Sequence, residues 1–198
     1  MSSMFNAILA IVGKSGKRLN QHIPEFRAFL EYASGYFSAR KINKPVVVEI
    51  GILDGAQRWF YEHLLSADYI GIDSGMESSM IGNPDIAGDS RLPKTVEELK
   101  ARLSGRPIDL LFIDGLHTYE GVKSDYEIYG PLTRHLIALH DIHTPKLHPG
   151  DSVDVARLWN EILATNKTDT LITIEHYNPR RPDEFNGRPL GIGLIIKE

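Results

Sequence analysis

The stretch VVVEIGILDG, residues 46–55, decides the fold of this 198-residue chain. Its first five residues are apolar except for Glu49. Such a short apolar run is typical of a parallel strand that is buried on both faces. Gly51 and Gly55 then permit a tight turn and the close approach of a ligand to the backbone. We therefore expect a central strand followed by a turn that can bind a ligand. An ordinary strand-to-helix turn would contain the same glycines. This stretch by itself therefore does not establish a ligand-binding site.

Similar apolar runs recur on the C-terminal side of this strand and alternate with stretches of helical period. The runs predict strands at 69–72, 86–88, 108–113, 136–139, 171–174 and 193–196, and helices at 23–37, 57–66, 95–104, 119–129 and 153–164. Such alternation indicates an α/β fold with helices on both faces of a parallel sheet. The last two strands are joined by a polar loop rich in Pro and Gly, so they form a hairpin. We expect a doubly wound, mostly parallel seven-stranded sheet with an antiparallel last strand.

Composition favours a folded enzyme of one domain. The chain has 42% hydrophobic and 24% charged residues, close to the globular average, and its net charge is −4. We expect a single domain over 1–198, with an N-terminal helical segment at 1–40 and the catalytic core at 45–198. The negative net charge gives no field that would attract nucleic acid. The absence of cysteine excludes thiolate ligands and suits a cytoplasmic protein.

The apolar run Met4–Val12 is too short to cross a membrane, which takes about 20 residues. Its basic residues follow the run instead of preceding it, so it does not read as a signal peptide. The sequence therefore predicts no membrane partner. A short packing helix, or a contact within a homo-oligomer, is the interpretation that remains.

Acidic residues follow several of the predicted strands, at the edge where doubly wound sheets bind ligands. Asp73 ends the second strand roughly 20 positions after the glycine turn, where a carboxylate can accept hydrogen bonds from both ribose hydroxyls. This pairing favours nucleoside binding over a simple helix-capping role. Asp89 and Ser90 could meet an adenine edge or cap the next helix, and both interpretations stay open. Leu53 breaks the Gly-x-Gly-x-x-Gly pattern, which disfavours a nicotinamide cofactor.

Five histidines lie between His117 and His148, interleaved with aspartates. Histidine and carboxylate suit Mg, Mn, Fe or Zn. We expect His135 and His148 to be exposed to solvent. His117 lies in the loop that should face the ligand, where a neutral imidazole could act as a general base or only order the loop. A metal-dependent hydrolase using His140, Asp141 and His143 is a rival interpretation.

The sequence resembles the class I S-adenosylmethionine-dependent methyltransferases. The resemblance rests on Val48-Glu49-Ile50-Gly51, Gly71-Ile72-Asp73, Gly88-Asp89-Ser90 and residues 136–142, and most specifically on Ile113-Asp114-Gly115-Leu116-His117-Thr118-Tyr119-Glu120. The resemblance covers roughly residues 46–142. Within the family, the sequence is most similar to the branch that includes cephalosporin-hydroxylase-like and macrolide-sugar O-methyltransferases. It implies a Rossmann-like methyltransferase fold and transfer of a methyl group to an oxygen of a small-molecule acceptor. A cofactor-binding module without transfer activity is the non-enzymatic alternative.

The resemblance also implies roles for individual residues. S-adenosyl-L-methionine would be held through Glu49, Gly51 and Gly55 at the methionine moiety, Asp73 at the ribose, and Asp89 and Ser90 near adenine, with Asp114 beside it. Relatives that use Mg or Mn take ligands from positions that correspond to Asp114, His140 and Asp141. His117 and Asp141 are the candidate catalytic residues. The chain departs from the family pattern at Leu116, often acidic there, and at Thr133-Arg134-His135, where a Gly-Gly turn is usual.

Overall fold

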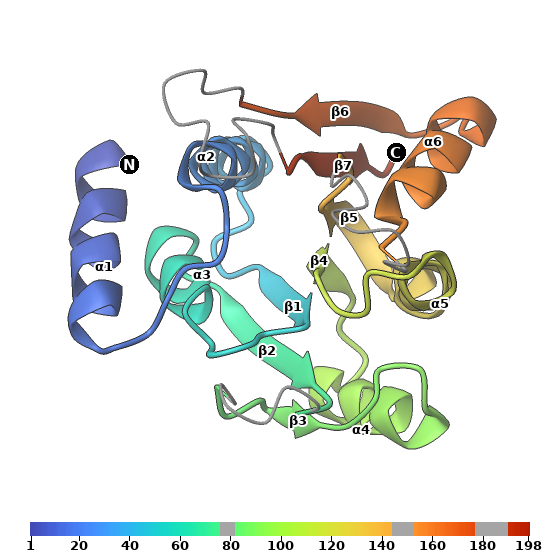
Figure 1. The fold of residues 1–198 in the computed structure, drawn as a ribbon, viewed down its shortest axis with the longest axis horizontal. Coiled ribbons are helices and arrows are strands. Elements are labelled where there is room, and N and C mark those ends of the chain that lie inside the picture. Colours follow the sequence, from blue (N-terminus) through green and yellow to red (C-terminus); the bar gives the residue numbers. More distant parts are fainter. Residues whose placement is uncertain (76–81, 144–152, 177–189) are drawn as a thin grey trace.

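The computed structural model of the chain describes residues 1–75, 82–143, 153–176 and 190–198. Within them lies a seven-stranded sheet with the strand order β3-β2-β1-β4-β5-β7-β6 (Figure 1). The strands are β1 (Val46–Ile50), β2 (Asp68–Asp73), β3 (Ile86–Ala87), β4 (Ile108–Ile113), β5 (Thr133–His140), β6 (Thr170–Ile174) and β7 (Ile192–Ile196). Pairing is parallel from β3 to β5, whereas β7 pairs antiparallel with both β5 and β6. The predicted fold class is confirmed, including the reversed last strand.

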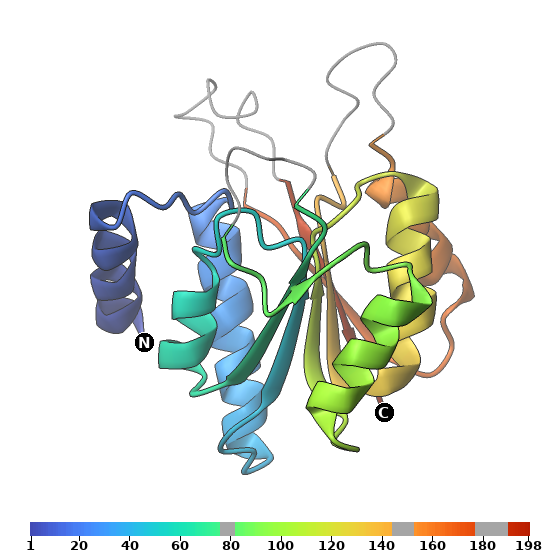
Figure 2. The ribbon, with the colours of Figure 1, turned by 90° about the horizontal axis from the view of Figure 1, so that it is seen from below.

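Helices cover both faces of the sheet (Figure 2). They are α1 (Ser2–Lys14), α2 (Ile23–Ala39), α3 (Arg58–Leu64), α4 (Pro93–Leu103), α5 (Tyr119–Tyr129) and α6 (Val155–Thr165). Val47 points to the core beneath α1, α2 and α3, while its neighbours Val46 and Val48 point to the core beneath α4, α5 and α6. Because β1 is buried along its whole length, its residues are apolar on both faces except for Glu49.

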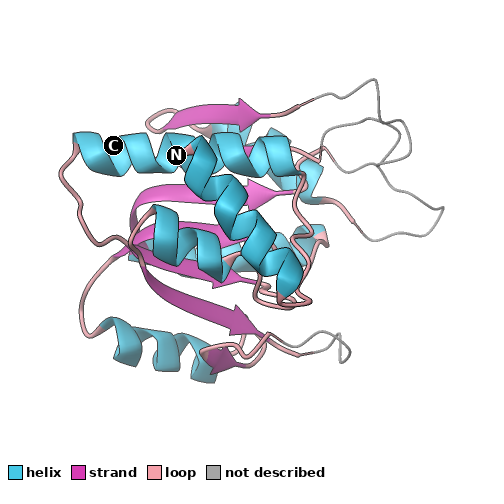
Figure 3. Ribbon diagram, turned by 90° about the vertical axis from the view of Figure 1, so that its left-hand side faces the viewer, coloured by secondary structure: helices cyan, strands magenta, loops and turns pink. Residues whose placement is uncertain are grey.

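The N-terminal run forms a packing helix, as expected. Phe5, Ile8 and Val12 recur at helical spacing and are buried, so α1 lies against α3 at the outside of the molecule (Figure 3). No described helix has the length and apolar character that a membrane span requires. After α1, residues 15–22 cross to α2 on the side of the molecule where the parallel strands have their carboxyl ends (Figure 2).

The segment Thr133-Arg134-His135, where the family usually turns, is the first part of β5. A 3-10 turn at Gly130–Leu132 supplies the reversal instead. His135 was expected to be exposed, but its side chain is only 18% exposed because it packs against the ring of Tyr36. The departure from the family pattern therefore lies at the opposite end of β5 from His140.

Candidate active site

A cavity of about 530 Å³ lies at the carboxyl ends of β1, β2, β4 and β5. This volume is within the range of small-molecule sites, and the position is where doubly wound sheets bind ligands. The ends of these four strands meet there because parallel neighbours end at the same edge of the sheet. The predicted site residues that line the cavity are Gly51, Asp73, Asp89, Ser90, Asp114, His117, His140 and Asp141.

Gly51 forms the floor of the cavity where the chain leaves β1. Its φ is +84°, and a Cβ placed on it would lie 2.2 Å from the carbonyl oxygen of Asp114. No other residue fits this close approach of two strand ends. Gly55 also has a positive φ of +73°, but it does not line the cavity. Gly51 therefore shapes the cavity directly, while Gly55 shapes the turn.

Asp73 holds the glycine turn from the end of β2. Its Oδ2 accepts hydrogen bonds from the backbone N–H groups of Ile52 at 2.9 Å and Leu53 at 3.1 Å, and its Oδ1 accepts one from Gly75 at 2.7 Å. A carboxylate can accept about four hydrogen bonds, so Asp73 keeps capacity for a ligand hydroxyl. Asp73 thus belongs both to the turn and to the wall of the cavity.

Glu49 does not line the cavity, although the sequence placed it among the cofactor residues. Its side chain is fully buried beneath the turn, where its Oε2 accepts a hydrogen bond from the hydroxyl of Tyr69. Its Oε1 has no hydrogen-bond partner among the described residues. Burial raises the pKa of Glu49 from 4.5 to about 8, so the carboxyl is neutral at pH 7.

Asp89 and Ser90 line the cavity near β3 but also have local partners. Asp89 accepts hydrogen bonds from the backbone and guanidinium of Arg91, and Ser90 donates to Asp125 at 2.6 Å. Neither caps α4, whose N-cap is Leu92. Sequence reasoning missed Asp125, although its spacing from Val122 and Tyr129 places it on the buried face of α5. Burial raises the pKa of Asp125 to about 6.

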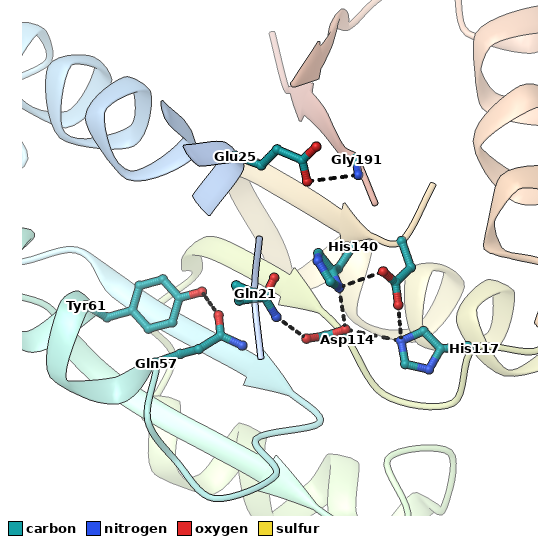
Figure 4. A network of polar contacts seen from close by, with 9 residues as sticks. Gln21, Glu25, Gln57, Tyr61, Asp114, His117, His140 and Gly191 are labelled. Carbon is teal, nitrogen blue, oxygen red and sulfur yellow. Dashed lines mark hydrogen bonds and ion pairs between the residues drawn. The ribbon is translucent and has the colours of Figure 1, made fainter. Parts of the chain in front are cut away.

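Asp114, His117, His140 and Asp141 form one cluster at the end of the cavity (Figure 4). Asp114 Oδ1 lies 2.9 Å from His140 Nδ1 and 3.2 Å from His117 Nε2. Asp141 Oδ2 lies 3.0 Å from His117 Nε2, and Asp141 Oδ1 lies 3.3 Å from His140 Nδ1. Asp141 also has a φ of +61°, which is uncommon for a residue with a side chain. The end of β5 thus turns sharply to bring two consecutive side chains to Asp114.

The two carboxylates and two imidazoles strongly perturb one another. Burial opposes charge on His117, yet its hydrogen bonds to Asp114 and Asp141 raise its pKa to about 10. Burial likewise raises the pKa of Asp114, but His140 and His117 outweigh it and lower that pKa. In the free protein the two carboxylates therefore favour the protonated form of His117 over the neutral imidazole.

The donor set of this cluster fits a divalent cation. Neighbouring ligand atoms around an octahedral ion with bonds of about 2.1 Å lie about 3 Å apart, close to the four distances above. Asp141 Oδ1 is buried and accepts no hydrogen bond from the described residues. Asp114, His140 and Asp141 were the predicted ligands, and His117 reaches the same point.

The ligand set of the hydrolase interpretation is not brought together. His143 Nε2 lies 2.8 Å from Glu175 Oε2, and His143 is not part of the cluster at His140 and Asp141. His148 lies outside the described residues.

A segment that precedes α2 also lines the cavity, and the sequence did not indicate this. Gln21, from the segment that precedes α2, donates a hydrogen bond through Nε2 to Asp114 Oδ2 at 2.6 Å (Figure 4). The two residues are 93 positions apart, and a lone glutamine in a loop carries no signal of such a contact. Arg18 and Asn20 of the same segment also line the cavity.

The strand order, with the glycine turn after β1 and acidic residues at the strand ends, is that of the Rossmann-like methyltransferase fold. Residues 48–142, just under half of the chain, match the family model described as a methyltransferase domain. The match runs from within β1 to just past the end of β5, so it includes the glycine turn and the whole cluster. No curated protein sequence matches the chain.

Several solved structures share the fold. A protein from Staphylococcus aureus assigned as a caffeoyl-CoA O-methyltransferase has a TM-score of 0.63 at 15% identity, over 98% of this chain and 92% of that one. The O-methyltransferase from Bacillus cereus, solved with S-adenosylhomocysteine (SAH), has a TM-score of 0.57 at 15% identity, over 98% and 91%. MycE of the mycinamycin biosynthetic pathway, solved with Mg and SAH, has a TM-score of 0.55 at 14% identity, over 84% of this chain and 49% of MycE.

Proposed function

We propose that this protein transfers the methyl group of S-adenosylmethionine to an oxygen atom of a small-molecule acceptor, with a divalent cation at the cluster of Asp114, His140 and Asp141. The observation that carries the proposal is that this cluster and the glycine turn line one cavity. Of the solved structures with the same fold, one is an O-methyltransferase, one is assigned as such, and a third, the methyltransferase MycE, was solved with Mg. These neighbours support the choice of oxygen as the acceptor atom.

The chain's own residues would divide the work along the cavity. Gly51 would let the backbone of the turn approach the methionine moiety, and Asp73 would accept a hydrogen bond from a ribose hydroxyl. Asp89 and Ser90 lie at the side of the cavity next to β3, where the adenine would bind. Asp114 stands between the two halves, since it is in contact with both Gly51 and the histidines.

When bound, the cofactor supplies an electrophilic methyl group on sulfur, and a divalent cation lowers the pKa of the acceptor hydroxyl. The carbon–sulfur bond breaks as the carbon–oxygen bond forms, and the acceptor oxygen loses its proton. His117 is the most exposed member of the cluster, at 35%, so it can reach that proton. The negative charge of Asp114 and Asp141 holds a proton on His117 in the free protein. Compensation of that charge would remove the cause of its high pKa and let it act as a general base.

Calorimetry with SAH and with Mn²⁺, followed by an acceptor screen, tests the proposal. The screen should cover catechols, sugars and hydroxy acids, with transfer followed by release of SAH. We expect both ligands to bind and at least one acceptor to be methylated, with Asp114→Asn losing Mn²⁺ binding. Binding of SAH without turnover of any acceptor would favour the cofactor-binding module. Failure to bind SAH would contradict the proposal altogether.

A further inference from the structure

Gln21 is a buried polar residue that reaches the cluster from a distant part of the chain. Gln21 is 6% exposed. Its amide nitrogen donates a hydrogen bond to Asp114 Oδ2, the carboxylate oxygen that does not contact the histidines. The two oxygens of Asp114 are therefore divided: one serves the histidines, and the other is held by the N-terminal segment. A carboxylate held at one oxygen cannot rotate freely to present the other.

The amide oxygen of Gln21 is a second and independent observation. Gln21 Oε1 is buried and has no hydrogen-bond partner among the described residues, while Gln21 lines the cavity. An unpaired buried acceptor costs about 1–3 kcal/mol, so such groups usually have a partner in the occupied state. A hydroxyl or water bound in the cavity would supply the missing donor.

The segment that carries Gln21 is fixed at both ends. On one side the backbone N–H of Arg18 donates to Asp54 Oδ2 at 2.5 Å, and Lys17 donates to the backbone carbonyl of Asp54, within the glycine turn. On the other side the buried Glu25 of α2 accepts hydrogen bonds from the backbone of His176 at 2.9 Å and of Gly191 at 3.1 Å (Figure 4). The segment around Gln21 is thus held on one side by the turn after β1 and on the other by residues that follow β6 and precede β7.

We infer that Gln21 is a positioning residue of the cation site, which orients the Asp114 carboxylate through its amide nitrogen. The inference rests on the proposed function, because it concerns the same cluster. By this inference the segment 15–22 is a part of the site, although it lies outside the residues 48–142 that match the methyltransferase-domain model. Residues that orient metal ligands typically contribute 10–100-fold to metal affinity.

The test compares Mn²⁺ and SAH affinity, by calorimetry, in the wild type, Gln21→Met and Gln57→Met. Methionine keeps the length of glutamine but removes the hydrogen bond. Gln57 is the matched control, since it is 7% exposed, lines the same cavity and bonds Tyr61 instead of Asp114. We expect Gln21→Met to weaken Mn²⁺ binding about tenfold or more, with SAH affinity within about threefold. Gln57→Met should leave Mn²⁺ affinity within about twofold.

A second variant, Gln21→Asn, serves if the methionine variant does not fold, because asparagine keeps the amide but is too short to reach Asp114. It should weaken Mn²⁺ binding in the same way. Equal Mn²⁺ affinity in the wild type and both Gln21 variants would overturn the inference and leave the proposed function intact. Loss of Mn²⁺ and SAH binding together, with a lowered melting temperature, would show a merely structural role and also overturn it. A wild type that binds SAH but no Mn²⁺ would contradict the cation itself, and the inference with it.

Discussion

Replacement of Glu49 by glutamine should change how the stability of the protein depends on pH. Glu49 is fully buried, and its pKa is raised to about 8 in the folded protein from 4.5. A carboxyl whose folded pKa is raised stabilises the fold most at pH values below its unfolded pKa. That contribution is lost as pH rises from about 4.5 towards 8, because the unfolded chain ionises first. The shift corresponds to a loss of about 3–4 kcal/mol in unfolding free energy between pH 5 and pH 8.

Glu49→Gln cannot ionise and keeps an oxygen that accepts from Tyr69, so it should escape this loss. Urea unfolding of both proteins at pH 5, 6, 7 and 8 measures the effect, as the difference in unfolding free energy between variant and wild type. This difference should rise with pH by about 3 kcal/mol. The matched control is Glu31→Gln, on the exposed surface of α2. For this control, the difference in unfolding free energy from the wild type should not rise with pH. Parallel curves for Glu49→Gln and the wild type would refute the reasoning.

The same variant separates two roles of Glu49. Because Glu49 does not line the cavity, we expect Glu49→Gln to keep SAH affinity within about threefold. A loss of tenfold or more would show that Glu49 contacts the methionine moiety, as the family resemblance implies.

Four further outcomes follow from the site. Gly51→Ala should lower the unfolding free energy by at least about 2 kcal/mol in urea titrations, because its Cβ would meet the backbone of Asp114 at positive φ. Asp73→Ala should weaken SAH binding by about 1–3 kcal/mol in calorimetry, and unchanged affinity would remove its ribose role. The pKa of Asp125 is raised from 3.8 to about 6, so Asp125→Asn should remove a loss of about 2 kcal/mol in unfolding free energy as pH rises from 4 to above 6; identical pH profiles would contradict this. With an acceptor identified, His117→Gln should lower turnover at least about tenfold at pH 7 while SAH affinity is retained; normal turnover would leave His117 a loop-ordering residue.

The sequence by itself determined the order and type of the elements. Strands β1 and β4 and helix α5 have the predicted bounds, because apolar runs between Pro and Gly and a clear helical period are local signals. Other ends shifted by a few residues, since tertiary contacts extend or trim an element beyond its periodic core. Parallel pairing then placed Asp73, Asp114, His140 and Asp141 at one edge, as their positions after strands predicted. Local pattern and strand direction were sufficient for that much.

Only the tertiary structure decided which of these side chains meet. Glu49 and Gly51 are two positions apart, yet Glu49 points beneath the turn to Tyr69 while Gly51 lines the cavity. His143 follows Asp141 by two residues but pairs with Glu175, so proximity in the chain misled the hydrolase interpretation. The protonation of His117 depends on two carboxylates from different strands, and Gln21 reaches Asp114 across 93 positions. Such contacts are set by how packed elements orient long side chains, and no period or motif in the sequence records that orientation.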